Sequence, residues 1–188
     1  TTANDTREQA MFERCNHRYT DLSEPGRGLS IFNDCKYGIS VQSGTMALTL
    51  AKGGTRPDER GDVGTYTFRY AIQPHAEGFS DKVPRRGMRF DRLPTVLAAD
   101  APSPALLTTS CRNVVVETVK PCEDAQNAMI VRLYECEGSH TAPVALHPGF
   151  AVTAAHQCDM AENAQFSVDL TNLAPFKPFE VRTVKIEY

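Results

Sequence analysis

The chain has 188 residues, of which 41% are hydrophobic, and a formal net charge of −3. This length accommodates one large domain or two small ones, each with a core that needs no disulfides. No segment approaches the roughly 20 consecutive apolar residues of a membrane helix, so a membrane protein is not expected. Acidic and basic residues are scattered, and the one basic cluster, between Lys82 and Arg89, is predicted to be a solvated loop beside Pro84 and Gly87. Because no aromatic residues interleave with it, nucleic acid is excluded as a partner.

The six cysteines form no CxxC pair and follow no apolar leader. This pattern is typical of reduced thiols, and it predicts a cytoplasmic protein. The even number leaves open a secreted chain with three disulfides, which a thiol titration would distinguish. The residues are Cys15, Cys35, Cys111, Cys122, Cys136 and Cys158.

Apolar and polar residues alternate along most of the chain, and no segment keeps a helical pattern over three turns. This period of two predicts an all-β fold, an antiparallel β-sandwich built from two packed modules. Strands are expected at 28–33, 39–42, 46–50, 65–72, 113–119, 128–136, 150–155, 165–170 and 179–186. Ser43 and Gly44 indicate a tight hairpin turn, and residues 122–127 a longer one.

The alternation lapses between residues 93 and 109, where three prolines stand among alanines and serines. Proline cannot donate a hydrogen bond to a central ladder, so this segment is predicted to be a linker. The linker separates an N-terminal β module at residues 10–92 from a C-terminal β-sandwich at residues 110–188.

Catalytic signatures are lacking in the sequence. Hydrolysis of a glycosidic bond ordinarily needs two opposed carboxyl groups. The sequence has 23 acidic residues, so their number alone does not identify a catalytic pair. The five histidines form no HExxH or HxH motif, and no nucleophile elbow or phosphate-binding loop is present. His17 and Asp21 lie four residues apart outside any helical pattern, which favours a structural histidine bonded to backbone or to a carboxylate. His75, at the end of a predicted strand, is expected to cap a loop.

Several short motifs occur in order along the chain. The segment 12–38 contains H-x-x-x-D-L-S-E at 17–24 and N-D-C-K-Y-G at 33–38. Downstream follow R-P-D at 56–58, T-F at 67–68, Y-A at 70–71, P-H at 74–75, N-V-V-V-E-T-V-K at 113–120, V-R-L-Y-E at 131–135 and P-F-E-V-R-T at 178–183. Together these motifs resemble the C-terminal β-domain region of the family 38 glycoside hydrolases, the α-mannosidases, and in particular their bacterial and cytosolic branch.

The resemblance implies a parent enzyme that releases mannose from α-mannosides with retention of configuration. In the family, the aspartate nucleophile and a divalent metal, usually zinc, lie in an N-terminal α/β barrel that has no counterpart in this sequence. The fragment itself is therefore expected to hold no cofactor and no catalytic residue, and to be inactive alone. Its expected partners are the catalytic barrel of the same polypeptide and, through the parent enzyme, an α-mannoside. The sequence leaves open whether the protein forms a homo-oligomer.

The turn at Asn33 to Gly38 is the best candidate for a wall of the active site. Its asparagine, aspartate and glycine predict a strand, a sharp turn and a returning strand, with Asp34, Lys36 and Tyr37 displayed at the tip for sugar binding. The alternative is that Asp34 caps the amides of its own turn and that Lys36 only pairs with it. Lys52 is a weaker candidate, because relatives often carry an arginine there and lysine cannot reproduce the guanidinium fork.

Two other functions compete with a non-catalytic α-mannosidase domain. One is a free-standing carbohydrate-binding β-sandwich, against which the absence of tryptophan counts. The other is an independent enzyme with an unrecognised site. If the barrel is the missing partner, the fragment should expose an apolar patch and self-associate.

Overall fold

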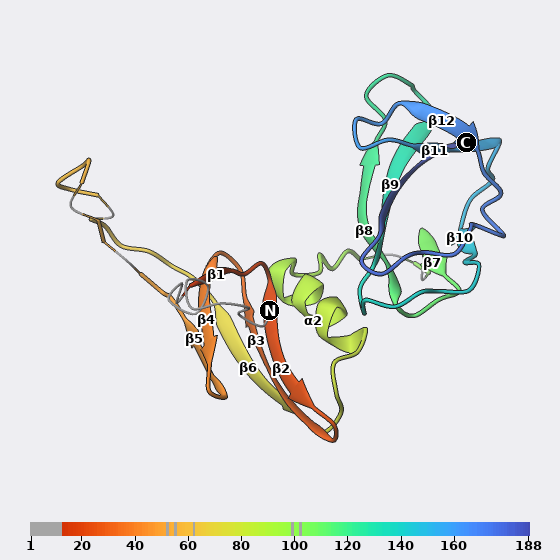
Figure 1. The fold of residues 1–188 in the computed structure, drawn as a ribbon. Coiled ribbons are helices and arrows are strands. Elements are labelled where there is room, and N and C mark those ends of the chain that lie inside the picture. Colours follow the sequence, from red (N-terminus) through yellow and green to blue (C-terminus); the bar gives the residue numbers. More distant parts are fainter. Residues whose placement is uncertain (1–12, 52, 55, 62, 99, 102) are drawn as a thin grey trace. The chain divides into compact units, whose positions relative to one another are not determined.

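The computed structural model describes residues 13–188 except 52, 55, 62, 99 and 102. The chain forms two compact units, Thr1–Thr95 and Val96–Tyr188. Both are built mainly from antiparallel strands, which confirms the all-β prediction (Figure 1). The boundary falls inside the segment 93–109, whose end forms strand β7 (Leu107–Thr109). Among the described helices, none has the length and apolar character of a membrane span.

The first unit contains a three-stranded sheet in the order β2-β3-β6. Strands β2 (Tyr19–Glu24) and β3 (Arg27–Asn33) form a hairpin, with Gly26 at φ 87° in the turn. The predicted strands omitted β2, because its apolar alternation is short and its sequence is rich in hydroxyl and carboxyl groups.

Strand β6 (Tyr70–His75) pairs with β3 from Asn33↔Tyr70 to Gly28↔His75. The prediction of a strand at 65–72 was wrong at its start. The chain leaves β3 after Asn33 and enters a loop, so residues 66–69 face no strand with which a ladder could continue.

A second small sheet has the order β1-β4-β5, with β1 at Arg14–Cys15, β4 at Gly38–Gln42 and β5 at Thr45–Leu48. Ser43 and Gly44 have φ 46° and 77° between the paired residues Gln42 and Thr45. Two positive φ values in a two-residue loop define the type I′ turn, so the predicted tight hairpin is confirmed.

Residues 82–91 form helix α2 (Lys82–Asp91), where a solvated loop was expected. Pro84 lies in the first turn, where the missing N–H has no helical partner to lose. Gly87 is buried beside Tyr19, so that an added Cβ would press against the tyrosine ring. Proline and glycine, which usually break helices, are therefore both compatible with this one. The helix is also too short to show an apolar pattern over three turns, so the sequence did not predict it.

Helix α2 covers one face of the β2-β3-β6 sheet. The rings of Phe32 and Phe90 lie 6.3 Å apart, and Tyr19 contacts both Gly87 and the ring of Phe79. Because side chains alternate along a strand, the residues next to Tyr19 and Phe32 point to the opposite face.

The second unit is organised around a five-stranded antiparallel sheet, β12-β11-β13-β9-β8, with a smaller β10–β7 pair (Figure 1). The strands are β8 Val114–Pro121, β9 Ala128–Glu135, β10 Leu146–Pro148, β11 Ala154–Cys158, β12 Ala164–Ser167 and β13 Val181–Glu187. The β8–β9 connection is the longer hairpin loop predicted at residues 122–127. By contrast, β11 begins four residues later than predicted, and Val168 and Leu170 lie beyond β12 in the core.

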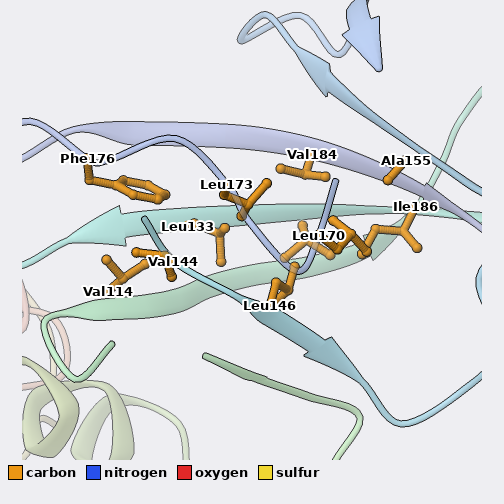
Figure 2. Packing of buried hydrophobic residues seen from close by; sticks show 11 residues of the cluster. Val114, Leu133, Val144, Leu146, Ala155, Leu170, Leu173, Phe176, Val184 and Ile186 are labelled. Atoms are coloured by element: carbon orange, nitrogen blue, oxygen red, sulfur yellow. The ribbon is translucent and has the colours of Figure 1, made fainter. Parts of the chain in front are cut away.

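The core of the second unit joins the large sheet to the segments that cross it. Leu133 and Val184 come from the sheet, Leu146 comes from the facing β10 strand, and Phe176 comes from the 169–176 segment (Figure 2). Phe176 is completely buried, with the Arg182 guanidinium 4.0 Å from its ring centroid. This two-layer packing gives the unit the character of a sandwich.

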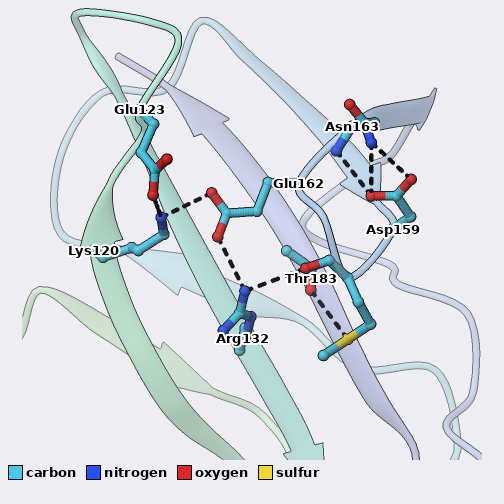
Figure 3. Close-up of polar contacts among 8 residues, drawn as sticks. Lys120, Glu123, Arg132, Asp159, Glu162, Asn163 and Thr183 are labelled. Carbon is cyan, nitrogen blue, oxygen red and sulfur yellow. Dashed lines mark hydrogen bonds and ion pairs between the residues drawn. The ribbon is translucent and has the colours of Figure 1, made fainter.

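An ion-pair network holds the β11–β12 connection against the sheet (Figure 3). Glu162 accepts from Arg132 of β9 at 3.0 Å and pairs with Lys120 of β8 at 3.0 Å. Lys120 also pairs with Glu123 at 2.7 Å. Glu162 thereby fixes the connection to one residue on each of two neighbouring strands.

Glu135 is a completely buried carboxylate at the end of β9. It accepts hydrogen bonds from the backbone N–H groups of Gly138 at 2.8 Å and Phe179 at 2.9 Å, and from the Asn113 amide at 2.8 Å. Burial raises the pKa of Glu135, but these donors outweigh it and the pKa lies below its ordinary value. One charge therefore organises the 137–139 turn and the approach to β13.

Candidate functional site

The loop from Asn33 to Gly38 carries the chain from one sheet of the first unit to the other. It leaves β3 and enters β4, which pairs with β1 and β5. The returning strand is therefore not the hairpin partner of β3. Asn33 is buried, and its Oδ1 accepts the backbone N–H of Lys36 at 2.7 Å, which closes the turn.

Asp34 is bound to Arg69, the residue that precedes β6. Its Oδ1 accepts the backbone N–H of Arg69 at 2.9 Å, and its Oδ2 accepts Nε of Arg69 at 3.0 Å. Arg69 also donates to the carbonyl of Phe90 at 3.2 Å at the end of α2. The backbone N–H of Arg69 is the main cause that lowers the pKa of Asp34. The alternative role for Asp34, capping the amides of its own turn, is wrong: Asn33 closes the turn.

Lys36 and Tyr37 occupy the outer part of the loop. The Lys36 ammonium lies 4.3 Å from the ring centroid of Phe68 instead of pairing with Asp34. Tyr37 is 57% exposed, and its ring stacks on His17 with centroids 5.9 Å apart and planes 8° from parallel. The exposed surface of the loop is therefore aromatic, with one cation beside it.

The segment Asn16–Arg18 is bound to this loop along its backbone. The N–H of Asn16 donates to the carbonyl of Tyr37 at 2.7 Å, and its side-chain amide donates to the carbonyl of Lys36 at 3.2 Å. The N–H of Asn33 donates to the carbonyl of Arg18 at 3.0 Å. We call the surface formed by residues 16–18, 33–37 and 68–69 the loop cluster.

The loop cluster brings Asp34, Lys36 and Tyr37 together, while Lys52 lies outside the described residues and stays a prediction. Sequence reasoning missed His17, Phe68 and Arg69. The collinear motifs gave a signal, since His17 and Phe68 lie within them and Arg69 stands between two of them. Neither spacing nor alternation placed residues 17 and 68 beside residues 36 and 37.

Asp21 and His75 form a separate buried cluster on the β2-β3-β6 sheet. Nε2 of His75 lies 2.8 Å from Oδ2 of Asp21, and Nδ1 lies 2.6 Å from the carbonyl of Glu77. Ser23 and Ser30 both donate to Asp21. Neither serine contacts His75, so the arrangement is not a nucleophile with its base. The structural prediction for His75 is confirmed, while Asp21 is bonded to His75 and not to His17.

Among residues 13–188, with the gaps given above, no group of three or more histidine, cysteine, aspartate or glutamate side chains could hold a metal ion. The zinc that the family resemblance implies belongs to the catalytic barrel, and the described residues of this chain offer no ligand set for it.

Two family models match the chain. The glycosyl hydrolases family 38 C-terminal domain matches residues 1–60, and the glycosyl hydrolases family 38 C-terminal beta sandwich domain matches residues 113–184. The second match coincides with the five-stranded sheet and its core. These comparisons give a free-standing carbohydrate-binding module no support.

Curated relatives agree with the family models. The chain is 38% identical over 185 residues to alpha-mannosidase 2C1 of Homo sapiens, covering 92% of this chain and 18% of that protein. It is 30% identical over 150 residues to an alpha-mannosidase of Saccharomyces cerevisiae, covering 70% of this chain and 14% of that protein. The chain thus spans less than a fifth of the length of these relatives.

A solved structure shares the fold. The crystal structure of an alpha-mannosidase from Enterococcus faecalis superposes with a TM-score of 0.69 at 22% identity, over 93% of this chain and 21% of that one. This likeness extends through both units. From the two family models and the sequence relatives, the chain belongs to glycoside hydrolase family 38 and carries the C-terminal domains of that family.

Proposed function

We propose that this chain is the non-catalytic C-terminal part of a longer α-mannosidase, in which it supports the catalytic domain and forms part of the active-site wall. The observation that carries the proposal is the match to an alpha-mannosidase along 92% of this chain but only 18% of that relative. The nucleophile and the zinc of the reaction then belong to the rest of the polypeptide, which removes terminal mannose with retention. The six free thiols support a cytoplasmic location.

The wall role is assigned to the loop cluster. Sugar rings are held by aromatic faces and by polar groups fixed in position, and the loop cluster offers both. Tyr37 is exposed, Lys36 lies next to it, and the ties of Asp34 to Arg69 hold the loop in one conformation. Asp34 serves in this arrangement by positioning the loop, because both of its oxygens already accept hydrogen bonds.

The assembly role is assigned to the open sheet face, the side of the β2-β3-β6 sheet opposite α2. Leu22 and Leu29 are each 36% exposed and Ile72 is 60% exposed on this face. Leu22 pairs with Leu29 and Ile31 with Ile72, so the apolar side chains form continuous rows across the strands. A groove of about 390 Å³ runs between these leucines and the turn at Gly44.

An antiparallel sheet with one solvated face normally alternates apolar and polar residues. Here the side opposite α2 exposes two leucines and an isoleucine where polar residues would be expected, so the open sheet face is expected to be covered. We assign the cover to the catalytic domain of the same polypeptide, since the matched relatives are more than five times the length of this chain.

The wall role is tested by assaying the full-length polypeptide on an aryl α-mannoside. We expect hydrolysis by the full-length protein, none by residues 1–188 alone, and a lower kcat/KM for the triple variant Asp34→Ala, Lys36→Ala, Tyr37→Ala. The exposed Asp124→Asn on the β8–β9 loop is the matched control. Hydrolysis by the isolated chain would overturn the proposal.

The assembly role is tested by sedimentation of the isolated chain. We expect concentration-dependent self-association that Ile72→Asp abolishes, because a charge on the open sheet face opposes its burial. Phe166→Asp, an equally exposed aromatic position on β12, should leave self-association unchanged. A wild-type chain that stays monomeric at all concentrations would count against the assignment of this face.

A further inference from the structure

The segment 17–19 makes a strained turn. The N–H of Tyr19 donates to the carbonyl of His17 at 2.8 Å, and the central residue, Arg18, has φ 64°. A three-residue turn closed in this way around a positive φ is a γ-turn of the rare, strained kind. Non-glycine residues in this region are strained and cluster at functional sites.

The surrounding structure compensates for this strain through contacts that leave the His17 ring free. Nε of Arg18 pairs with Asp91 at 3.1 Å, and the carbonyl of Arg18 accepts the N–H of Asn33. Asn16 is tied to the loop at two points. Four contacts thus maintain an unfavourable backbone conformation that fixes the position of the His17 side chain.

That side chain is an exposed imidazole stacked on an exposed phenol. The rings of His17 and Tyr37 are nearly parallel, with planes 8° apart. Neither ring nitrogen of His17 has a hydrogen-bond partner within the described part of the chain, whereas both nitrogens of His75 are engaged. His17 therefore has one donor and one acceptor available toward solvent when neutral.

We propose that His17 and Tyr37 form a platform for a pyranose ring, on which Tyr37 covers the apolar C–H face and His17 hydrogen-bonds a hydroxyl. Arg18 is the positioning residue that holds the platform together. The inference rests on the proposed wall function and deepens it by naming His17 as a substrate contact. A neutral sugar fits better than an anion, because the neighbouring cations are engaged: Lys36 lies over the ring of Phe68, and Arg18 pairs with Asp91.

Two readouts on the full-length polypeptide test the platform. The first is calorimetric titration with an α-linked mannobioside under conditions without turnover, and the second is kcat/KM for the same disaccharide. His17→Ala and Tyr37→Ala should each weaken binding about threefold to tenfold, the size of one aromatic contact. The loss should appear in KM rather than kcat, with an unchanged unfolding midpoint. His140→Ala, an exposed histidine of the second unit, is the matched control.

The double variant distinguishes a platform from two separate contacts. If the two rings act together, the loss in the His17→Ala, Tyr37→Ala protein should be smaller than the product of the single losses. Wild-type binding and kcat/KM in both single variants would overturn the platform while leaving the wall proposal intact.

The two proposals fail separately. A full-length protein that neither binds nor hydrolyses any α-mannoside would overturn the proposed function. Titration with β-linked and other pyranosides would then decide the platform: loss of binding in His17→Ala supports it, and a wild-type protein that binds no pyranoside overturns it.

Discussion

Nε2 of His75 lies 2.8 Å from Oδ2 of Asp21, and neither side chain is more than 6% exposed. The two residues are 54 positions apart and sit on the outer strands of a three-stranded sheet. His75 reaches across the central strand over Gly28, where a Cβ would overlap its ring. The D-L-S-E and P-H motifs are thus two ends of one structural clamp, which accounts for their joint presence without any catalytic role.

Removing one member of the clamp should destabilise the first unit. Asp21→Asn and His75→Ala each leave buried polar groups without their partner, so we expect losses of about 3–5 kcal/mol in the free energy of unfolding. Urea unfolding measures them. Arg27→Gln, which breaks an exposed ion pair with Glu24, should cost less than about 1 kcal/mol. Equal effects of the buried and exposed variants would contradict the clamp.

Gly28→Ala should destabilise the same unit by steric overlap and not by the loss of a polar partner. The new methyl group would overlap the ring of His75 and the hydroxyl of Ser23. We expect a loss of about 1–3 kcal/mol from overpacking. Gly78→Ala is the control, because a Cβ there meets no atom within 4 Å. In a His75→Ala background the cost of Gly28→Ala should shrink, and an unchanged cost would show that His75 is not the obstacle.

Glu135→Gln should destabilise the second unit in a pH-dependent way. The variant replaces one carboxylate oxygen with an amide that faces the N–H groups of Gly138 and Phe179, and we expect a loss of about 3 kcal/mol at neutral pH. The lowered pKa of Glu135 means that its contribution is complete above the ordinary glutamate value of about 4.3 and is lost as the pH falls through the folded-state pKa.

Urea midpoints at a series of pH values test this linkage. The difference between wild type and Glu135→Gln should therefore narrow toward acid. Asp124→Asn, exposed in the same unit, should give a small difference at neutral pH. A wild-type advantage that grows below pH of about 4 would contradict the assigned direction of the pKa shift.

Arg69→Lys should loosen the loop cluster with little change in global stability. Lysine keeps the charge but cannot donate simultaneously to Asp34 and to the carbonyl of Phe90. We expect faster hydrogen exchange at the amide of Lys36, whose acceptor is Asn33, and a nearly unchanged unfolding midpoint because the Arg69 side chain is 43% exposed. Arg60→Lys, in an exposed turn, should leave that exchange rate at the wild-type value.

Some elements could be predicted from the pattern of neighbouring residues. The alternation of apolar residues predicted the strands at 128–135 and 181–187 closely, since both are buried on the core side. Ser43 and Gly44 predicted their hairpin, since two positive φ values in succession favour such residues. Local chemistry failed at 82–91, where Pro84 and Gly87 indicate a break but the helix tolerates the first and Tyr19 requires the second.

The all-β class, the resemblance to family 38 and residues 34, 36 and 37 of the candidate loop were predictable before folding, because alternation and short motifs are properties of neighbouring residues. The folded chain was needed to see that Arg69 holds Asp34, that Asp21 contacts His75, and that His17 stacks on Tyr37. Each of these contacts joins segments that strand pairing and loop closure bring together. Their partners therefore depend on register and on backbone geometry such as the turn at Arg18, which no local pattern in the sequence encodes.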